Sequence, residues 1–298
     1  MNDMLPQLDW WTTTAIPAIQ QVLPFRSHPF EINALCECLL LAPLCAVMGV
    51  KVVNFRMAFF SDAISHSAFT GVAIGLLLDQ LLASRGRHFD PRIALILFGL
   101  IVGLGIAAVR RRTDLSTDTV IGVFFSAVVA LGIAIVTTSS SRTAEFTRYL
   151  YGDILTLDAA DLGLTAILAV CVALFMLLSF NPLTLIGLNH ELAHSRGIRV
   201  RFYDYAFSFL LALVVTTSIR TTGILLVTAM LIVPAATARN LARGAGGMFW
   251  WAILVAVVGG LGGTLASFSP YLDNVGTGAA IVLATTALFC ISLVVARR

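Results

Sequence analysis

Long apolar stretches alternate with short polar segments along most of the chain. Each stretch is continuously apolar rather than alternating with a period of two, which favours membrane-spanning helices over the strands of a barrel. In lipid, a helix also satisfies its own backbone polar groups. The pattern predicts an all-α, polytopic membrane protein with eight or nine spans, at about 31–50, 58–82, 93–109, 119–138, 161–180, 203–219, 222–238, 248–267 and 276–295.

The composition agrees with a chain that lies mostly in lipid. Of the 298 residues, 58% are hydrophobic and only 12% are charged, whereas a soluble domain carries about 25% charged residues. The net charge is +3 and the basic residues are dispersed. The sequence therefore indicates no nucleic-acid partner.

The first 30 residues are expected to form an N-terminal extension ahead of a transmembrane domain at 31–298. They lack the basic start and apolar core of a cleavable signal, and Trp10 and Trp11 favour an interfacial helix. With the loop after the first span inside, the inner loops hold twelve basic residues, Lys51 in the first of these loops among them, and the outer side seven. This bias predicts an external N-terminus and a cytoplasmic C-terminus.

Small residues recur every four positions on two predicted spans. Ser67, Gly71 and Gly75 lie on the second span, and Gly99 and Gly103 lie on the third. Small side chains at this spacing let neighbouring helices approach closely. We therefore expect both stripes to be helix contacts.

The stretch "MAFFSDAISHSAFTG" places two polar side chains, Asp62 and His66, inside the second span. A charge near the bilayer centre costs at least ~2.5–3.5 kcal/mol, so it is a functional candidate. Residues four apart share a helix face. A carboxylate with an imidazole suits zinc, and also manganese or iron. The alternative is a pair whose hydrogen bonds are satisfied within their own turn.

Other polar or helix-breaking residues in the spans are weaker candidates for an ion pathway. Glu37 lies near the outer end of the first span, where it either snorkels to the surface or contributes a ligand. Pro234 frees a carbonyl in mid-helix, and Met230 before it is better explained by packing. The possible pathway residues are Glu37, Ser65, Met230 and Pro234.

The stretch "NHELAHSRG" contains His190-Glu191-Leu192-Ala193-His194, the H-E-x-x-H spacing of a zinc hydrolase. A catalytic zinc needs a third protein ligand and an open fourth position. Of the remaining histidines, His28 and His88 are expected on the opposite side of the membrane, and the motif itself follows a span. A metalloprotease or a cytoplasmic metal site stays an alternative to a purely structural loop.

Five stretches in order resemble the membrane permease of bacterial ABC importers for zinc, manganese and iron. They are "FRMAFFSDAISHSAFTGVAIG", "TDTVIGVFFSAVVALG", "RYLYGDIL", "LNHELAHSRGIRVRFYD" and "LLVTAMLIVPAATAR". The resemblance covers about residue 30 to the C-terminus. Ser61 and Thr70 depart from the glycine and proline that are common in the family, which weakens any transfer of metal preference.

The resemblance implies a translocation subunit rather than an enzyme, in the bacterial cytoplasmic (inner) membrane. It would pair with a second copy, with cytoplasmic ABC ATPase subunits and with an extracytoplasmic metal-binding protein. Asp62 and His66 would contact the ion in transit. The residues expected to couple to the ATPase are His190, Glu191, Leu192, His194, Arg196 and Gly197.

ATP is expected on a partner chain because no G-x-x-x-x-G-K-[ST] motif occurs, and the only lysine, Lys51, is not followed by serine or threonine. No permanently bound cofactor is expected, and zinc is the preferred cargo, with manganese or iron next. The alternatives from other classes are a proton-coupled metal carrier and an intramembrane metalloprotease that uses His190, Glu191 and His194.

Overall fold

A computed structural model describes residues 29–83, 86, 88–138, 159–268 and 276–296, and these residues form helices without any strand. Nine of the helices are long and apolar enough to cross a membrane, which confirms the predicted all-α polytopic fold. Residues 1–28, with the predicted interfacial helix, lie outside the described residues. The helices are α3 (Pro29–Asn54), α4 (Ala58–Ala83), α5 (Pro91–Arg112), α6 (Thr117–Thr138), α8 (Ala159–Leu188), α9 (His190–Ser195), α10 (Val200–Thr222), α11 (Ile224–Leu241), α12 (Ala245–Ser267) and α13 (Thr277–Ala296).

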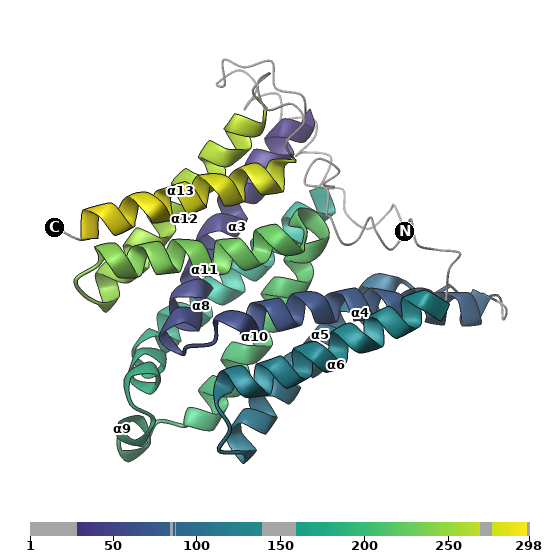
Figure 1. Ribbon diagram of the computed structural model, residues 1–298, viewed down its shortest axis with the longest axis horizontal. Helices are drawn as coiled ribbons and strands as arrows, with labels where there is room; N and C mark the ends of the chain where they lie inside the picture. Colours follow the sequence, from purple (N-terminus) through teal and green to yellow (C-terminus); the bar gives the residue numbers. More distant parts are fainter. Residues whose placement is uncertain (1–28, 84–85, 87, 139–158, 269–275, 297–298) are drawn as a thin grey trace.

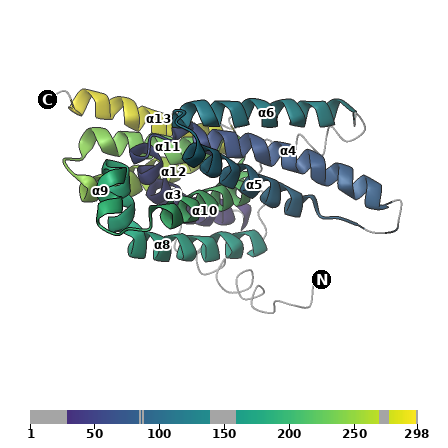
Figure 2. The ribbon, with the colours of Figure 1, turned by 90° about the horizontal axis from the view of Figure 1, so that it is seen from below.

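The spans form two groups joined through α10 (Figure 1). One group packs α3, α11, α12 and α13 together, and the other packs α5 and α6 against α4. Helix α10 contacts α4 and α5 on one side and α8 and α11 on the other. Figure 2 shows α6 and α8 on opposite faces of the assembly, and both views place α9 at one end of it. We call this end the α9 end.

The two small-residue stripes lie at helix contacts, as predicted. A Cβ added to Gly71 would lie 2.8 Å from the Cα of Leu95, and one added to Gly75 would lie 2.7 Å from the Cα of Pro91, so α4 packs tightly on α5. A Cβ on Gly103 would lie 2.9 Å from the Cβ of Ala212 on α10. Backbone-to-backbone packing therefore fixes α4, α5 and α10 relative to one another.

Replacing Gly49 by alanine should destabilise the protein by about 1–3 kcal/mol, the usual cost of overpacking a core. A Cβ at Gly49 would collide with the carbonyl oxygen of Leu231, so α3 and α11 would have to separate. The measurement is thermal unfolding of the purified protein in detergent. Gly262→Ala on α12 is the control, because nothing lies within 4 Å of the added Cβ and alanine favours a helix. Equal unfolding temperatures for Gly49→Ala and the wild type would contradict this account of the α3–α11 contact.

Lys51 was expected in the first inner loop, and this expectation is wrong. Helix α3 continues to Asn54, and the Lys51 side chain is only 1% exposed. Its ammonium group donates to the Thr184 hydroxyl at 2.6 Å and to the Phe180 carbonyl oxygen at 3.2 Å. These acceptors lie on α8, which passes through Pro182 and ends at Leu188 rather than near residue 180. The buried ammonium is therefore satisfied by polar atoms beside the proline.

Candidate functional site

Asp62 and His66 lie on the second and third turns of α4, and both side chains are half-buried. The neighbouring serines make bonds within the helix: Ser61 donates to the carbonyl oxygen of Ala58 and Ser67 to that of Ile64. Among the described residues, Asp62 and His66 take part in no hydrogen bond or ion pair. Their polar atoms are therefore available to a ligand, which counts against a pair that is satisfied within its own turn.

The face of α4 that carries this pair turns toward α6. The His66 ring meets the Phe125 ring edge to face, with 4.9 Å between centroids and an interplanar angle of 83°. One turn further, the Thr70 hydroxyl donates to the carbonyl oxygen of Val128 at 2.8 Å. Asp62, His66 and Thr70 are spaced by four residues and share one face. The Asp62–His66 pair consequently lies at the seam between α4 and α6.

The other pathway candidates do not join this pair in one cluster. Ser65 is fully buried and its hydroxyl oxygen has no hydrogen-bond partner among the described residues. Met230 is 2% exposed, and its Cε lies 3.4 Å from the position of a Cβ on Gly260. It therefore packs against α12, and Pro234 is buried within α11. Across the described part of the chain, no three His, Cys, Asp or Glu residues are grouped to hold a metal ion.

Glu37 is 0% exposed, so the alternative in which it snorkels to the surface is wrong. Its Oε1 accepts hydrogen bonds from the hydroxyls of Thr165 at 2.9 Å and Thr221 at 3.3 Å. These residues come from α8 and α10, which cover this part of α3. Its Oε2 has no partner in the described part of the chain. Glu37 is thus an interior carboxylate with one satisfied oxygen, far along α3 from Lys51.

The H-E-x-x-H stretch forms the six-residue helix α9, directly after the long span α8. Asn189 caps it, because its side-chain oxygen accepts from the backbone N–H groups of Glu191 and Leu192. Ala193 is fully buried, whereas Leu192 is 45% exposed. The turn after α9 contains Gly197 with a φ of 75°, a conformation that favours glycine. The motif is therefore a short helix at the end of the bundle rather than part of a span.

Three further residues of the predicted coupling segment are also accessible. The side chains of Glu191, His194 and Arg196 are exposed, and the backbone N–H of Arg196 closes the helix on the Leu192 carbonyl oxygen. Intramembrane zinc hydrolysis would require the motif within a span and a third ligand beside it. The position of α9 instead suits contact with another protein.

One charged cluster at the α9 end was missed by the sequence analysis. Asp204, on the second turn of α10, is 3% exposed and bonds the Arg111 guanidinium at 2.7 Å. Arg110 lies 3.6 Å from the same carboxylate and also donates to the Met57 sulfur. The cluster links the end of α5 to the start of α10. The signal available in the sequence was the acidic residue Asp204 just inside a predicted span, where a charge needs a partner.

The described residues form nine apolar helices and an exposed short helix at one end. One of the apolar helices carries a carboxylate and an imidazole that have no hydrogen-bond partner among these residues. Together these features indicate a polytopic membrane transport subunit. Residues 27–296 match the model of the ABC 3 transport family. The chain belongs to this family. It is a permease subunit rather than an enzyme, as its motifs predicted.

Two curated relatives cover nearly the whole chain. The chain is 34% identical over 266 residues to the manganese import system permease protein ScaB of Streptococcus parasanguinis, covering 89% of this chain and 90% of that one. It is 31% identical to the high-affinity zinc uptake system membrane protein ZnuB of Haemophilus influenzae, covering 89% and 97%.

A solved structure shares the fold. PsaBC from Streptococcus pneumoniae, in complex with Fab, contains a chain that matches with a TM-score of 0.72 and 30% identity. The match covers 92% of this chain and 93% of that chain. The agreement in both sequence and fold therefore extends over most of the chain.

Proposed function

We propose that the chain is the membrane permease of an ATP-dependent importer of divalent metal ions, with zinc as the preferred ion and manganese or iron as alternatives. The observation that carries this proposal is the Asp62–His66 pair, whose polar atoms meet no partner among the described residues. Oxygen and imidazole nitrogen together suit zinc. Relatives named for manganese and for zinc are both found, so manganese stands close behind.

The small number of protein ligands fits a passing ion. Transport requires an ion to bind well enough to enter and weakly enough to leave. One carboxylate and one imidazole on a single chain give less than the four ligands of a structural zinc site. Asp62 and His66 would therefore contact the ion transiently, after an extracytoplasmic binding protein delivers it.

A second copy of the chain is proposed to pack on α6. Gly122, Ser126 and Ala130 recur every four residues on this helix and are all exposed. Small residues at this spacing favour close helix association in lipid. Because His66 contacts Phe125 on the same helix, a second copy here would bring two Asp62–His66 pairs toward one interface.

The ATPase subunits are proposed to bind at α9, which the charge bias of the loops predicts to lie in the cytoplasm together with the C-terminus. Leu192 is exposed on α9, and the buried Ala193 anchors the helix beside Ile186 and Val200. Movement of α9 would therefore be passed to α8 and α10. Closure of the ATPase pair would shift these spans and change access to the ion.

Purification of the chain with its genomic neighbours tests the proposed function. We expect an ATPase chain and a metal-binding protein to remain associated, and ATP hydrolysis by the reconstituted complex to rise with the loaded binding protein. Running the assay with zinc, manganese and iron in turn identifies the preferred ion. Metal transport driven by a proton gradient without any ATPase chain would instead establish the carrier alternative.

Replacing Glu191 by glutamine should leave metal uptake nearly unchanged. Its side chain is exposed, and the cap on α9 uses its backbone N–H rather than its carboxylate. In a zinc hydrolase the same change would remove the general base. Uptake in cells and peptidase activity of the purified protein are measured together. A peptidase activity that Glu191→Gln abolishes would support the metalloprotease alternative instead.

A further inference from the structure

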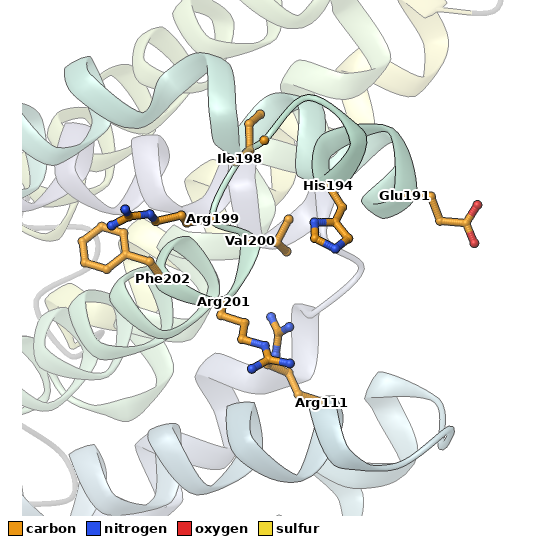
Figure 3. A pocket seen from close by; sticks show the side chains of 9 residues that line it. Arg111, Glu191, His194, Ile198, Arg199, Val200, Arg201 and Phe202 are labelled. Carbon is orange, nitrogen blue, oxygen red and sulfur yellow. The ribbon is translucent and has the colours of Figure 1, made fainter.

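Three nitrogen-bearing side chains from three helices face one cavity at the α9 end. The cavity has a volume of about 800 Å³, and its lining includes Arg111, His194 and Arg201. Figure 3 shows these three side chains turned toward a common space, whereas the carboxylate of Glu191, which also lines the cavity, points away from the three nitrogen-bearing groups. Arg111 belongs to the last turn of α5 and Arg201 to the first turn of α10. Nitrogen donors from α5, α9 and α10 therefore line the same cavity.

The positive charge at this cavity exceeds the negative charge available to it. Asp204 already pairs with both Arg110 and Arg111. Among the described acidic groups, none forms an ion pair with Arg199 or Arg201. Guanidinium groups bind phosphate oxygens with two parallel hydrogen bonds. The charge and donor geometry at the cavity thus suit a phosphate group.

The apolar part of the lining identifies the source of that phosphate. Ile198, Val200 and Phe202 line the cavity beside the arginines, and Phe202 is 63% exposed. Further along α10, Tyr205 and Phe209 are 36% and 41% exposed, so an apolar surface continues from the cavity along the span. A free phosphate ion would gain nothing from contact with this apolar surface. A phospholipid has both a charged headgroup for the arginines and acyl chains for the apolar surface.

We propose that this cavity binds the headgroup of an anionic phospholipid, with Arg111 and Arg201 on the phosphate and the acyl chains along the exposed aromatic residues of α10. The cavity lies where α5 ends and α10 begins, which is the level of the headgroups for a helix that spans a bilayer. Basic pockets between spans on the cytoplasmic side are known to take anionic headgroups. The proposal rests on a membrane location with the α9 end on the cytoplasmic side, and it does not depend on which ion is transported.

Binding of phosphatidylglycerol to the full-length protein in detergent tests the proposal, with lipid per chain measured by native mass spectrometry. Arg201→Gln should weaken binding about tenfold or more, because it removes charged hydrogen bonds to the phosphate. Arg201→Lys should weaken it less, since the charge remains but the paired donors are lost. Arg239→Gln is the matched control: it removes an exposed arginine from the last turn of α11 at the same end of the bundle. It should bind phosphatidylglycerol as the wild type does.

Three results would overturn the proposal. The first is wild-type binding of phosphatidylglycerol by both Arg201 variants, or equal weakening by Arg239→Gln. The second is displacement of the lipid by excess inorganic phosphate alone, which would show a site for a free anion. The third is unchanged lipid binding by Arg201→Gln together with loss of an associated ATPase chain, which would show that the cavity receives an acidic side chain of a protein partner. The thermal unfolding temperature of each variant distinguishes loss of the site from loss of the fold.

Discussion

Replacing Asp62 by asparagine should abolish metal uptake and leave the transporter assembled. Asparagine keeps the shape of the side chain but removes the charge that attracts a cation. The fold should tolerate the change, because Asp62 forms no hydrogen bond or ion pair with the described residues. Removing a group that only orients a metal ligand already costs about 10- to 100-fold, so loss of a ligand should lower uptake by at least ~100-fold. Uptake of radioactive zinc or manganese, with recovery of the complex by affinity purification, gives both readouts.

The matched control for Asp62 is the other aspartate of α4. Asp79 accepts a hydrogen bond from the Phe89 backbone N–H at 3.1 Å and lies 3.6 Å from His88, near the opposite end of the helix. Asp79→Asn keeps an acceptor oxygen and should transport close to the wild-type rate. Wild-type uptake by Asp62→Asn would remove this carboxylate from the ion pathway. Equal loss in both variants would point to a general effect on α4.

Replacing Asp204 by alanine should lower the free energy of unfolding by about 3 kcal/mol, the lower part of the range for breaking a buried charge pair. The change would leave the guanidinium groups of Arg110 and Arg111 facing each other, with side-chain exposures of only 14% and 24%. The link between the end of α5 and the start of α10 would then be replaced by repulsion. Unfolding of the purified protein in detergent, followed by temperature or denaturant, measures the loss.

Asp114→Ala is the control for Asp204, because Asp114 is exposed just after α5 and surface charges contribute little. Combining Asp204→Ala with Arg111→Gln should cost less than the sum of the two single changes, since the double variant removes part of the repulsion. Additive effects, or an Asp204 variant as stable as the Asp114 variant, would show that this cluster does not stabilise the bundle.

The spans were predictable from the sequence because apolar length is a local property. All nine appear where the hydropathy pattern placed them, and the small-residue stripe of Gly71 and Gly75 lies against α5 as expected. The residues at which the helices end were less predictable. Helix α8 continues past Pro182 to Leu188, and the Phe180 carbonyl oxygen beside the proline accepts from the ammonium of Lys51 and the hydroxyl of Thr184.

The buried polar residues show why local pattern was insufficient. Glu37 near a span end was compatible with snorkelling, but Thr165 and Thr221 cover it from helices that follow more than 120 residues later, as the separations of 128 and 184 residues show. Asp204 is likewise satisfied by Arg110 and Arg111, which are adjacent residues at the end of α5. Which distant helices meet is decided by tertiary packing, and no spacing within one helix reveals it.

For the candidate site, the sequence gives the shared face of Asp62 and His66 but not what that face meets. The contact of His66 with Phe125 identifies α6 as the neighbour. The H-E-x-x-H stretch shows the opposite situation: its spacing is that of a zinc hydrolase, although the family resemblance already predicted a coupling loop. Its place on the six-residue helix α9, outside the spans, also favours coupling to a partner.

Locating the ion directly tests the claim that Asp62 and His66 lie on the metal pathway. The assembled transporter, trapped with bound zinc or manganese, would be crystallised and examined by anomalous scattering at the absorption edge of the metal. We predict a peak about 2.0–2.2 Å from a carboxylate oxygen of Asp62 and an imidazole nitrogen of His66. A single strong peak at a different position within the spans, with both side chains free of metal, would contradict the account.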